Sequence, residues 1–119
     1  PFLVLPSGRF FVLINGNESI KRQRFSMAHE LAHITVMPNM ASTVYCGKSN
    51  NWEESVCDSF AGKLLVPDDF LLKYFENRPN PYLEDVATAF QVSPEVAHIR
   101  MRDMGLSYIT RFDYQFLHK

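Results

Sequence analysis

The N-terminal part of the chain alternates short apolar runs with turn residues. Phe2–Leu5 is one apolar run and Arg9–Ile14 is a second, and residues 6–8 (Pro-Ser-Gly) between them have the composition of a tight turn. Residues 15–16 (Asn-Gly) end the second run. The pattern predicts two short antiparallel strands joined as a hairpin.

Helical spacing replaces this pattern after residue 18. Residues 19–36 contain few helix breakers, and Ala28, Leu31 and Ile34 fall on one side of the expected helix. A loop containing a short strand at 43–45 is expected next. A second helix then begins near residue 50 or 51. Its apolar stripe has the spacing of a buried face and comprises Cys57, Phe60, Ala61, Leu64 and Leu65.

The C-terminal part is predicted to be helical, with well-marked helix ends. Short helices are expected at residues 70–75 and 83–90. Ser93 is a typical N-cap, so a last helix is expected to follow it and to stop at Gly105. With the N-terminal strands, this order predicts an α+β fold in which a small antiparallel sheet packs on a mainly helical body.

Length and charge are those of one globular domain. The 119 residues are 46% hydrophobic and 21% charged, which supports a single domain over residues 1–119. Twelve basic and thirteen acidic residues give a net charge of -1, so nothing in the overall charge favours nucleic acid or an anionic membrane. No apolar run approaches the roughly 18 residues that would span a bilayer.

Two further features concern the origin of the chain. It does not begin with Met, so we expect an excised piece of a longer protein. The two cysteines, Cys46 and Cys57, lack the Cys-x-x-Cys spacing and are too few for a disulfide framework. A reducing, cytoplasmic compartment is therefore expected.

Residues 29–33, His-Glu-Leu-Ala-His, form an H-E-x-x-H motif inside the first predicted helix. Because a helical turn takes about 3.6 residues, His29 and His33 project from one face and can ligate the same Zn²⁺. Glu30 lies beside that face and can reach a metal-bound water without binding the metal. The pattern is typical of a metallopeptidase whose Glu is the general base. A chance pair of histidines is the alternative.

A catalytic zinc needs a third protein ligand. Glu54, in the first turn of the next long helix, is the candidate. Asp58 lies on the same face and can orient an imidazole through its free ring N–H. Glu53 points about 100° away, and first-turn acids also occur simply because the helix dipole favours them. Cys57 is a softer alternative ligand, but it falls in the apolar stripe, where a small buried Cys is common.

Three segments resemble the ImmA/IrrE metallo-endopeptidases. Residues 24–33, RFSMAHELAH, resemble that family's R-F-[ST]-x-A-H-E-[LI]-x-H segment. Residues 54–67, ESVCDSFAGKLLVP, resemble its E-x-x-A-[ND]-x-F-A…L-L-x-P segment, and residues 90–106 resemble its C-terminal F-x-V-S…R-L…L-G-L segment. Cys57 stands where the family usually has Ala, and Ala32 where Gly is common. Neither departure removes a catalytic group.

The resemblance implies a zincin-like fold of the gluzincin type, with H-E-x-x-H on the active-site helix. It implies one Zn²⁺ per chain held by His29, His33 and Glu54, with Glu30 as general base. Asp58 would orient a ligand side chain without binding the metal. Zinc is favoured over Mn²⁺ or Fe²⁺ by geometry. The resemblance also implies an endopeptidase that acts on a protein. Characterised members look like bacterial or mobile-element proteins, including those of phages, that cut a DNA-binding helix-turn-helix repressor, so a repressor is the substrate expected by analogy.

Peptide hydrolysis also needs a donor for the tetrahedral oxyanion. The sequence offers Tyr45, Tyr82, His98 and Tyr108 as candidates for this or for another substrate contact. For each of them a structural role is the better explanation.

A second interpretation is a DNA-binding or partner-binding module. Residues 83–102 resemble a helix-turn-helix, with Arg100 and Arg102 as basic residues of the second helix. Direct nucleic-acid binding is nevertheless not expected, because the net charge is near zero and Glu95 stands where phosphate contacts are made. A third interpretation is a structural or sensory zinc site. An intact Glu30 argues against it, because such a site needs no general base.

Overall fold

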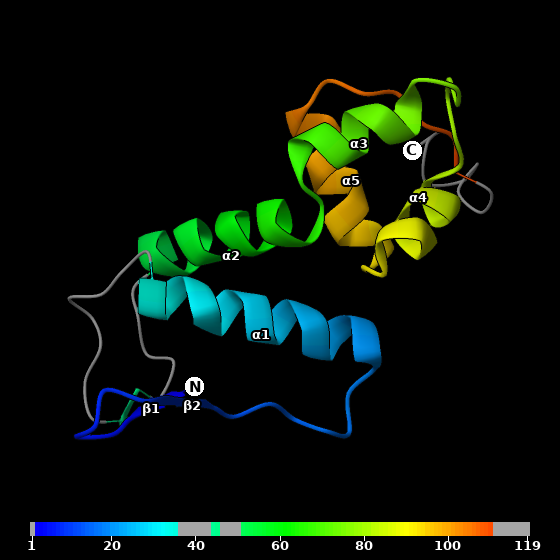
Figure 1. Cartoon of the computed structure of the whole chain (residues 1–119). Coiled ribbons are helices and arrows are strands. Elements are labelled where there is room, and N and C mark those ends of the chain that lie inside the picture. The colour runs from blue at the N-terminus through cyan, green and yellow to red at the C-terminus, as the bar shows by residue number, and fades with distance from the viewer. Residues whose placement is uncertain (1, 36–43, 46–50, 111–119) are drawn as a thin grey trace. The chain divides into compact units, whose positions relative to one another are not determined.

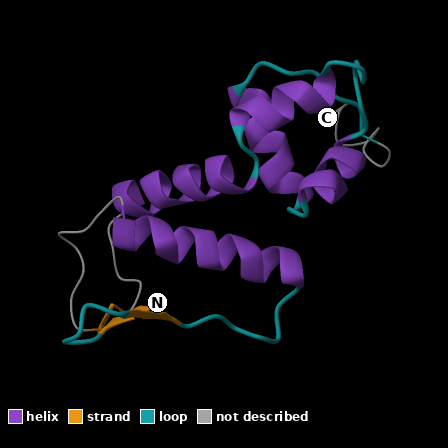
Figure 2. Ribbon diagram, viewed as in Figure 1, coloured by secondary structure: helices purple, strands orange, loops and turns teal. Residues whose placement is uncertain are grey.

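The computed structural model describes residues 2–35, 44–45 and 51–110. In this part of the chain two strands precede a long helix, a further short strand and four more helices (Figure 1, Figure 2). The chain divides into two compact units, Pro1–Leu64 and Leu65–Lys119. The elements are β1 Phe2–Val4, β2 Phe10–Val12, α1 Ile20–Thr35, β3 Val44–Tyr45, α2 Asn51–Leu65, α3 Asp68–Phe75, α4 Leu83–Phe90 and α5 Pro94–Asp103.

Strand β1 is the central strand of a three-stranded antiparallel sheet with the order β2-β1-β3. It pairs with β2 in the register Leu3↔Phe11. The turn between them closes at Leu5, whose N–H donates to the Arg9 carbonyl and whose carbonyl accepts from the Gly8 N–H, both at 2.9 Å. Gly8 has a φ of 85°, which is a left-handed conformation that glycine adopts at little cost. This turn fixes the hairpin register.

Helix α1 buries polar residues. It follows Ser19, whose Oγ accepts a hydrogen bond from the Arg22 N–H at 3.2 Å. Its buried residues are small or ionisable: Ala28, Glu30, Ala32 and His33. Ala28 and Leu31, which the helical spacing places on one side, differ in burial, because Ala28 is 4% exposed and Leu31 is 40% exposed. The helix turns Glu30 and His33 inward instead, and Leu31 points away from them.

The apolar stripe of α2 is shorter than its sequence spacing predicts. Cys57 and Ala61 are fully buried. Leu64, expected to continue the stripe, is 46% exposed. The fully buried part of the stripe therefore consists of small side chains, whereas Phe60 and Leu65 are half-buried.

The second unit has its own apolar core, built from the end of α2 and from α3, α4 and α5. Gln91 closes α4 with a left-handed φ of 55°, and Ser93 caps α5 by accepting a hydrogen bond from the Val96 N–H at 3.2 Å. A turn of three residues thus connects the two helices, and the predicted N-cap is confirmed. The buried cluster comprises Val66, Leu71, Val86, Ala87, Val92, Ala97 and Met101.

Gly105 ends α5, as the sequence predicts. It has a φ of 68°, and its N–H donates to the Arg102 carbonyl at 3.1 Å. The Leu106 N–H returns to the Met101 carbonyl at 2.9 Å, which completes a Schellman-type stop. The predicted mainly helical body is therefore confirmed, and none of the helices described has the length and apolar character to cross a membrane.

Candidate metal centre

His29 and His33 lie one turn apart on α1 and face the same way. Their rings meet edge to face with centroids 4.8 Å apart, and the two Nε2 atoms are 3.1 Å apart. The His33 side chain is 1% exposed and that of His29 is 14% exposed. Two ring nitrogens therefore converge at one protected point, as the four-residue spacing predicts.

Helix α2 brings a carboxylate to the same point. Glu54, in its first turn, places Oε2 2.8 Å from His29 Nε2 and Oε1 3.2 Å from His33 Nε2. One ligand atom from each of the three side chains lies within 4.8 Å of the other two. The carboxylate thus contacts both imidazoles from the facing helix.

The spacing of these atoms suits a tetrahedral cation. Zinc bonds of about 2.0–2.1 Å at tetrahedral angles place neighbouring ligand atoms about 3.3 Å apart. The separations here are 3.1, 2.8 and 3.2 Å. Two imidazole nitrogens and one carboxylate also form a donor set that catalytic zinc uses when its fourth position stays open. The residues present therefore fit a zinc ion.

Asp58 secures the orientation of His29. Its Oδ1 lies 2.7 Å from His29 Nδ1, the ring nitrogen that does not face Glu54. Because an ionised carboxylate only accepts hydrogen bonds, the contact with Asp58 favours the tautomer with the proton on Nδ1. In that tautomer Nε2 would offer its lone pair to a metal held between it and the Glu54 carboxylate. His29 is thus held between two carboxylates that are one turn apart on α2.

Replacing Asp58 with Asn is expected to weaken zinc binding about 10- to 100-fold without unfolding the chain. The amide has nearly the same shape but lacks the negative charge that fixes the protonated Nδ1 of His29. Competition with a chromogenic chelator measures the zinc dissociation constant. Asp69, exposed at the start of α3, gives the matched control Asp69→Asn. Equal affinity in the Asp58 variant and the control would contradict this role.

Glu30 follows His29 on α1 and is only 8% exposed. Its carboxylate is not among the converging ligand atoms. Its negative charge is one of those that raise the pKa of the Cys57 thiol on α2. Glu30 is thus a buried carboxylate beside the ligand group and outside it.

Cys57 is buried in a strongly acidic environment. Burial, and then the negative charges of Glu54, Asp58, Glu30 and Glu53, raise the pKa of its thiol from 9.0 to about 11. Among the described residues, the candidate ligand group consists of the two histidines and Glu54, without the thiol. The alternative of Cys57 as a ligand therefore gains no support. A bound cation would offset the mutual repulsion of these negative charges.

The raised pKa of Cys57 should make the metal-free protein less stable in alkali. The unfolded thiol ionises near 9.0 and the folded one near 11, so the unfolded chain releases its proton first as the pH rises. The free energy of unfolding therefore falls between these values, by about 2–3 kcal/mol in total. Denaturant unfolding at a series of pH values measures this loss. Cys57→Ala should remove it, and an unchanged pH dependence in that variant would contradict the assignment.

The four candidates for oxyanion or substrate contact have other surroundings. Tyr45 pairs in the sheet through its backbone, which is the only part of it that is described. His98 Nδ1 and the Tyr108 hydroxyl are hydrogen-bonded to each other in the second unit. Tyr82 precedes α4 and forms a bridge with Ile109 in the same unit. These contacts are structural, and the roles of the four residues at the metal centre stay predictions.

Phe25 is a neighbour of the site that the H-E-x-x-H motif does not reveal. The centroids of its ring and that of His29 are 6.4 Å apart. The signal in the sequence is the four-residue spacing on one helix, which brings two side chains together whether or not they belong to a motif.

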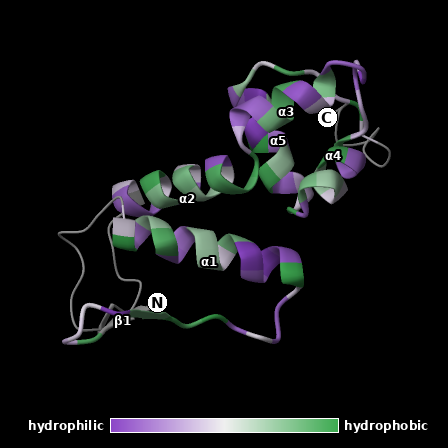
Figure 3. Ribbon diagram, in the orientation of Figure 1, coloured by the Kyte–Doolittle hydropathy of each residue, from purple (hydrophilic) through white to green (hydrophobic). Residues whose placement is uncertain are grey.

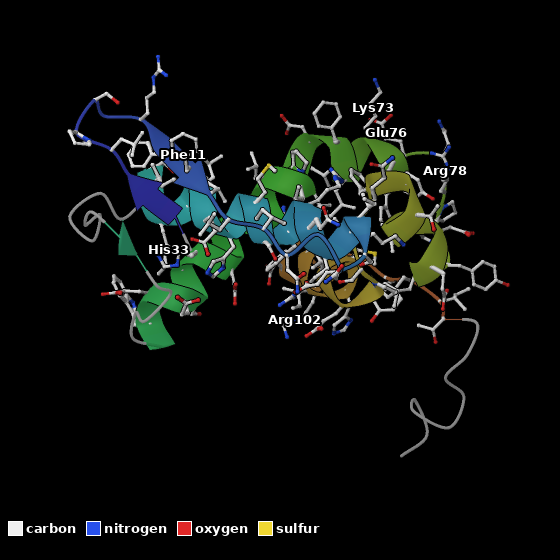
Figure 4. All side chains as sticks on the ribbon, turned by 90° about the horizontal axis from the view of Figure 1, so that it is seen from below. Phe11, His33, Lys73, Glu76, Arg78 and Arg102 are labelled. Carbon is white, nitrogen blue, oxygen red and sulfur yellow. The ribbon has the colours of Figure 1, made fainter. Side chains whose placement is uncertain are left out.

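The helix-turn-helix interpretation loses one of its two arginines. Arg100 is 2% exposed, its Nε donates to the Val66 carbonyl at 3.0 Å, and its guanidinium pairs with Asp68. A guanidinium held inside the second unit is not available to phosphate. Arg102 alone of the pair points into solvent (Figure 4).

An H-E-x-x-H helix facing a glutamate from a second helix is the donor arrangement of a metallopeptidase. The family model described as the IrrE N-terminal-like domain, of the M78 peptidases, matches residues 3–102. The match covers most of the chain, which therefore belongs to this family, as the three resembling segments predict. Searches among curated proteins and among solved structures gave no match. Membership implies a metallopeptidase that acts on a protein substrate.

Proposed function

We propose that the chain is a zinc-dependent endopeptidase that hydrolyses a peptide bond within a protein. The observation that carries this proposal is the convergence of His29 Nε2, His33 Nε2 and the Glu54 carboxylate. Membership of a peptidase family supports the same activity. Glu30 favours turnover over a purely structural or sensory zinc site, because only turnover needs a base there.

The side chains around the ion have distinct tasks. Zinc held by the three ligands would polarise the scissile carbonyl and lower the pKa of a bound water to about 7. Glu30 takes the proton of the attacking water and passes it to the leaving amine. Its burial on the helix that carries two ligands restricts its movement and so limits the orientations of its carboxylate. Asp58 keeps the His29 ring in its metal-binding tautomer.

The finer assignments rest on the family resemblance and on composition. We propose a DNA-binding helix-turn-helix repressor as the substrate and the cytoplasm as the compartment, where a free thiol such as Cys57 is stable. We also propose that residues 1–119 are one minimal peptidase domain. The family match from 3 to 102 supports this, because it runs across the boundary of the two compact units at Leu64.

Incubation of the zinc-loaded chain with purified helix-turn-helix repressors tests the proposal. We expect one or a few defined cuts, identified by mass spectrometry, that stop with 1,10-phenanthroline and resume when zinc is restored. Cleavage that continues unchanged in the chelator would overturn the metal-dependent mechanism. Equal cleavage of an unrelated folded protein would overturn the assignment of a repressor substrate.

A further inference from the structure

The face of α1 that carries the metal ligands continues toward the start of the helix. Arg22 and Phe25 precede His29 by seven and four residues, which places them on or beside the same face. The Phe25 and His29 ring centroids are 6.4 Å apart, and the guanidinium carbon of Arg22 lies over the Phe25 ring, 5.8 Å from its centroid. A continuous line of contacts thus runs from the candidate metal centre to an exposed cation.

The charge at this end of α1 is opposite to what a helix start favours. The first turn contains no acidic residue, and Lys21 and Arg22 stand where the helix dipole favours anions. Arg22 occupies the third position after the Ser19 cap, where Glu or Gln would complete a capping box. Figure 3 shows the resulting hydrophilic band just after the first residue of α1. Local helix stability therefore does not explain these cations.

The present partner of Arg22 is easily replaced. Arg22 Nε lies 3.3 Å from Glu18 Oε2, and the two side chains are 65% and 39% exposed. Such an exposed pair contributes little to stability, so a carboxylate from a ligand can take the place of Glu18. The Phe25 ring limits the orientations of the guanidinium and leaves its N–H groups free to form a two-point contact with a carboxylate.

We propose that Arg22 and Phe25 form a substrate subsite that selects peptides carrying Asp or Glu near the scissile bond. This inference rests on the proposed function. Seven helical residues separate Arg22 from His29, a rise of about 10.5 Å. An extended peptide advances about 3.3 Å per residue, so the selected acid lies roughly three residues from the cleaved bond. Phe25 contributes an apolar contact for the part of the peptide between the acid and that bond.

Cleavage of a randomised peptide mixture by the zinc-loaded full chain tests the subsite. Mass spectrometry of the products should show Asp and Glu enriched at one position about two to four residues from the cut. Arg22→Glu should reverse this preference toward Lys and Arg. It should also lower kcat/KM for an acid-containing peptide roughly three- to tenfold. Because Glu is favoured at this helix position, the variant is expected to fold. Lys63→Glu, at an exposed site on α2, is the matched charge control and should keep the acidic preference.

A second readout separates this inference from the proposed function. The same mixture is passed over immobilised, zinc-loaded Glu30→Gln protein, and the retained peptides are sequenced. Retention of acidic peptides that depends on Arg22 supports the subsite even if no cleavage occurs, in which case the proposed function fails alone. Cleavage without acidic preference, or with a preference unchanged in Arg22→Glu, overturns the subsite and leaves the peptidase assignment standing. Neither cleavage nor acidic retention overturns both.

Discussion

Glu30→Gln is expected to leave zinc binding unchanged and to lower kcat/KM for peptide hydrolysis about 10²- to 10⁴-fold. The amide preserves the size of a side chain that is only 8% exposed, but it does not accept a proton from water at neutral pH. Because the Glu30 carboxylate is not among the converging ligand atoms, its loss should spare the metal. Parallel measurements of cleavage rate and zinc content separate the two effects.

Glu53→Gln is the matched control for this substitution. Glu53 lies on α2, is also 8% exposed, and makes no contribution to the candidate ligand group. We expect this variant to keep most of the activity. Cleavage that survives in Glu30→Gln, or that is lost equally in both variants, would contradict Glu30 as the general base.

Arg100→Met is expected to cost about 3 kcal/mol of stability, which lowers Tm by roughly 10 °C. The Arg100 side chain is 3% exposed, and it donates to the carbonyl of the fully buried Val66, the residue that follows α2. Methionine fills much of the volume but leaves that carbonyl without its donor. The pair with Asp68 contributes less, because the Asp68 side chain is 55% exposed and water can replace the guanidinium.

Thermal unfolding of Arg100→Met beside Arg102→Met measures this difference. The Arg102 side chain is 66% exposed, so its loss should change the free energy of unfolding by less than about 0.5 kcal/mol. A similar Tm in the two variants would contradict the structural role of Arg100. Strong duplex DNA binding that is lost in Arg100→Met without loss of stability would revive the helix-turn-helix interpretation.

Features set by neighbouring residues could be predicted from the sequence. Ser93 begins α5 and Gly105 ends it because capping depends on a few adjacent backbone groups. The convergence of His29 and His33 follows from the helical repeat alone. The contact of Asp58 with His29 could be predicted for the same reason. If Glu54 faces the histidines, Asp58 also faces them, because it lies one helical turn further along α2.

Features set by distant packing could not be predicted. Leu31 and Leu64 have suitable apolar spacing, yet they are 40% and 46% exposed, since spacing does not say which neighbour covers a face. Arginine is usually found at the surface, and only the folded structure shows that Arg100 donates to the Val66 carbonyl. Of the second apolar run, expected over 9–14, Phe10–Val12 form the strand that pairs with β1, which itself has three residues.

Two remaining predictions concern the short strand expected at 43–45 and the two cysteines. Val44 and Tyr45 of the short strand expected at 43–45 form β3, whereas Thr43 lies outside the described residues. Cys46 lies outside them as well, so its pairing state stays a prediction. Among the described residues, Cys57 has a free thiol.

The most direct test of the central claim is the zinc content of the purified, tag-free chain and of Glu54→Ala, measured by elemental analysis after zinc is offered at neutral pH. We expect one zinc ion per chain in the wild-type protein, none in Glu54→Ala, and one in Glu53→Ala, which removes the neighbouring carboxylate of the same helix turn. No zinc in the wild-type chain, or full retention of zinc in Glu54→Ala, would contradict the three-ligand centre of His29, His33 and Glu54.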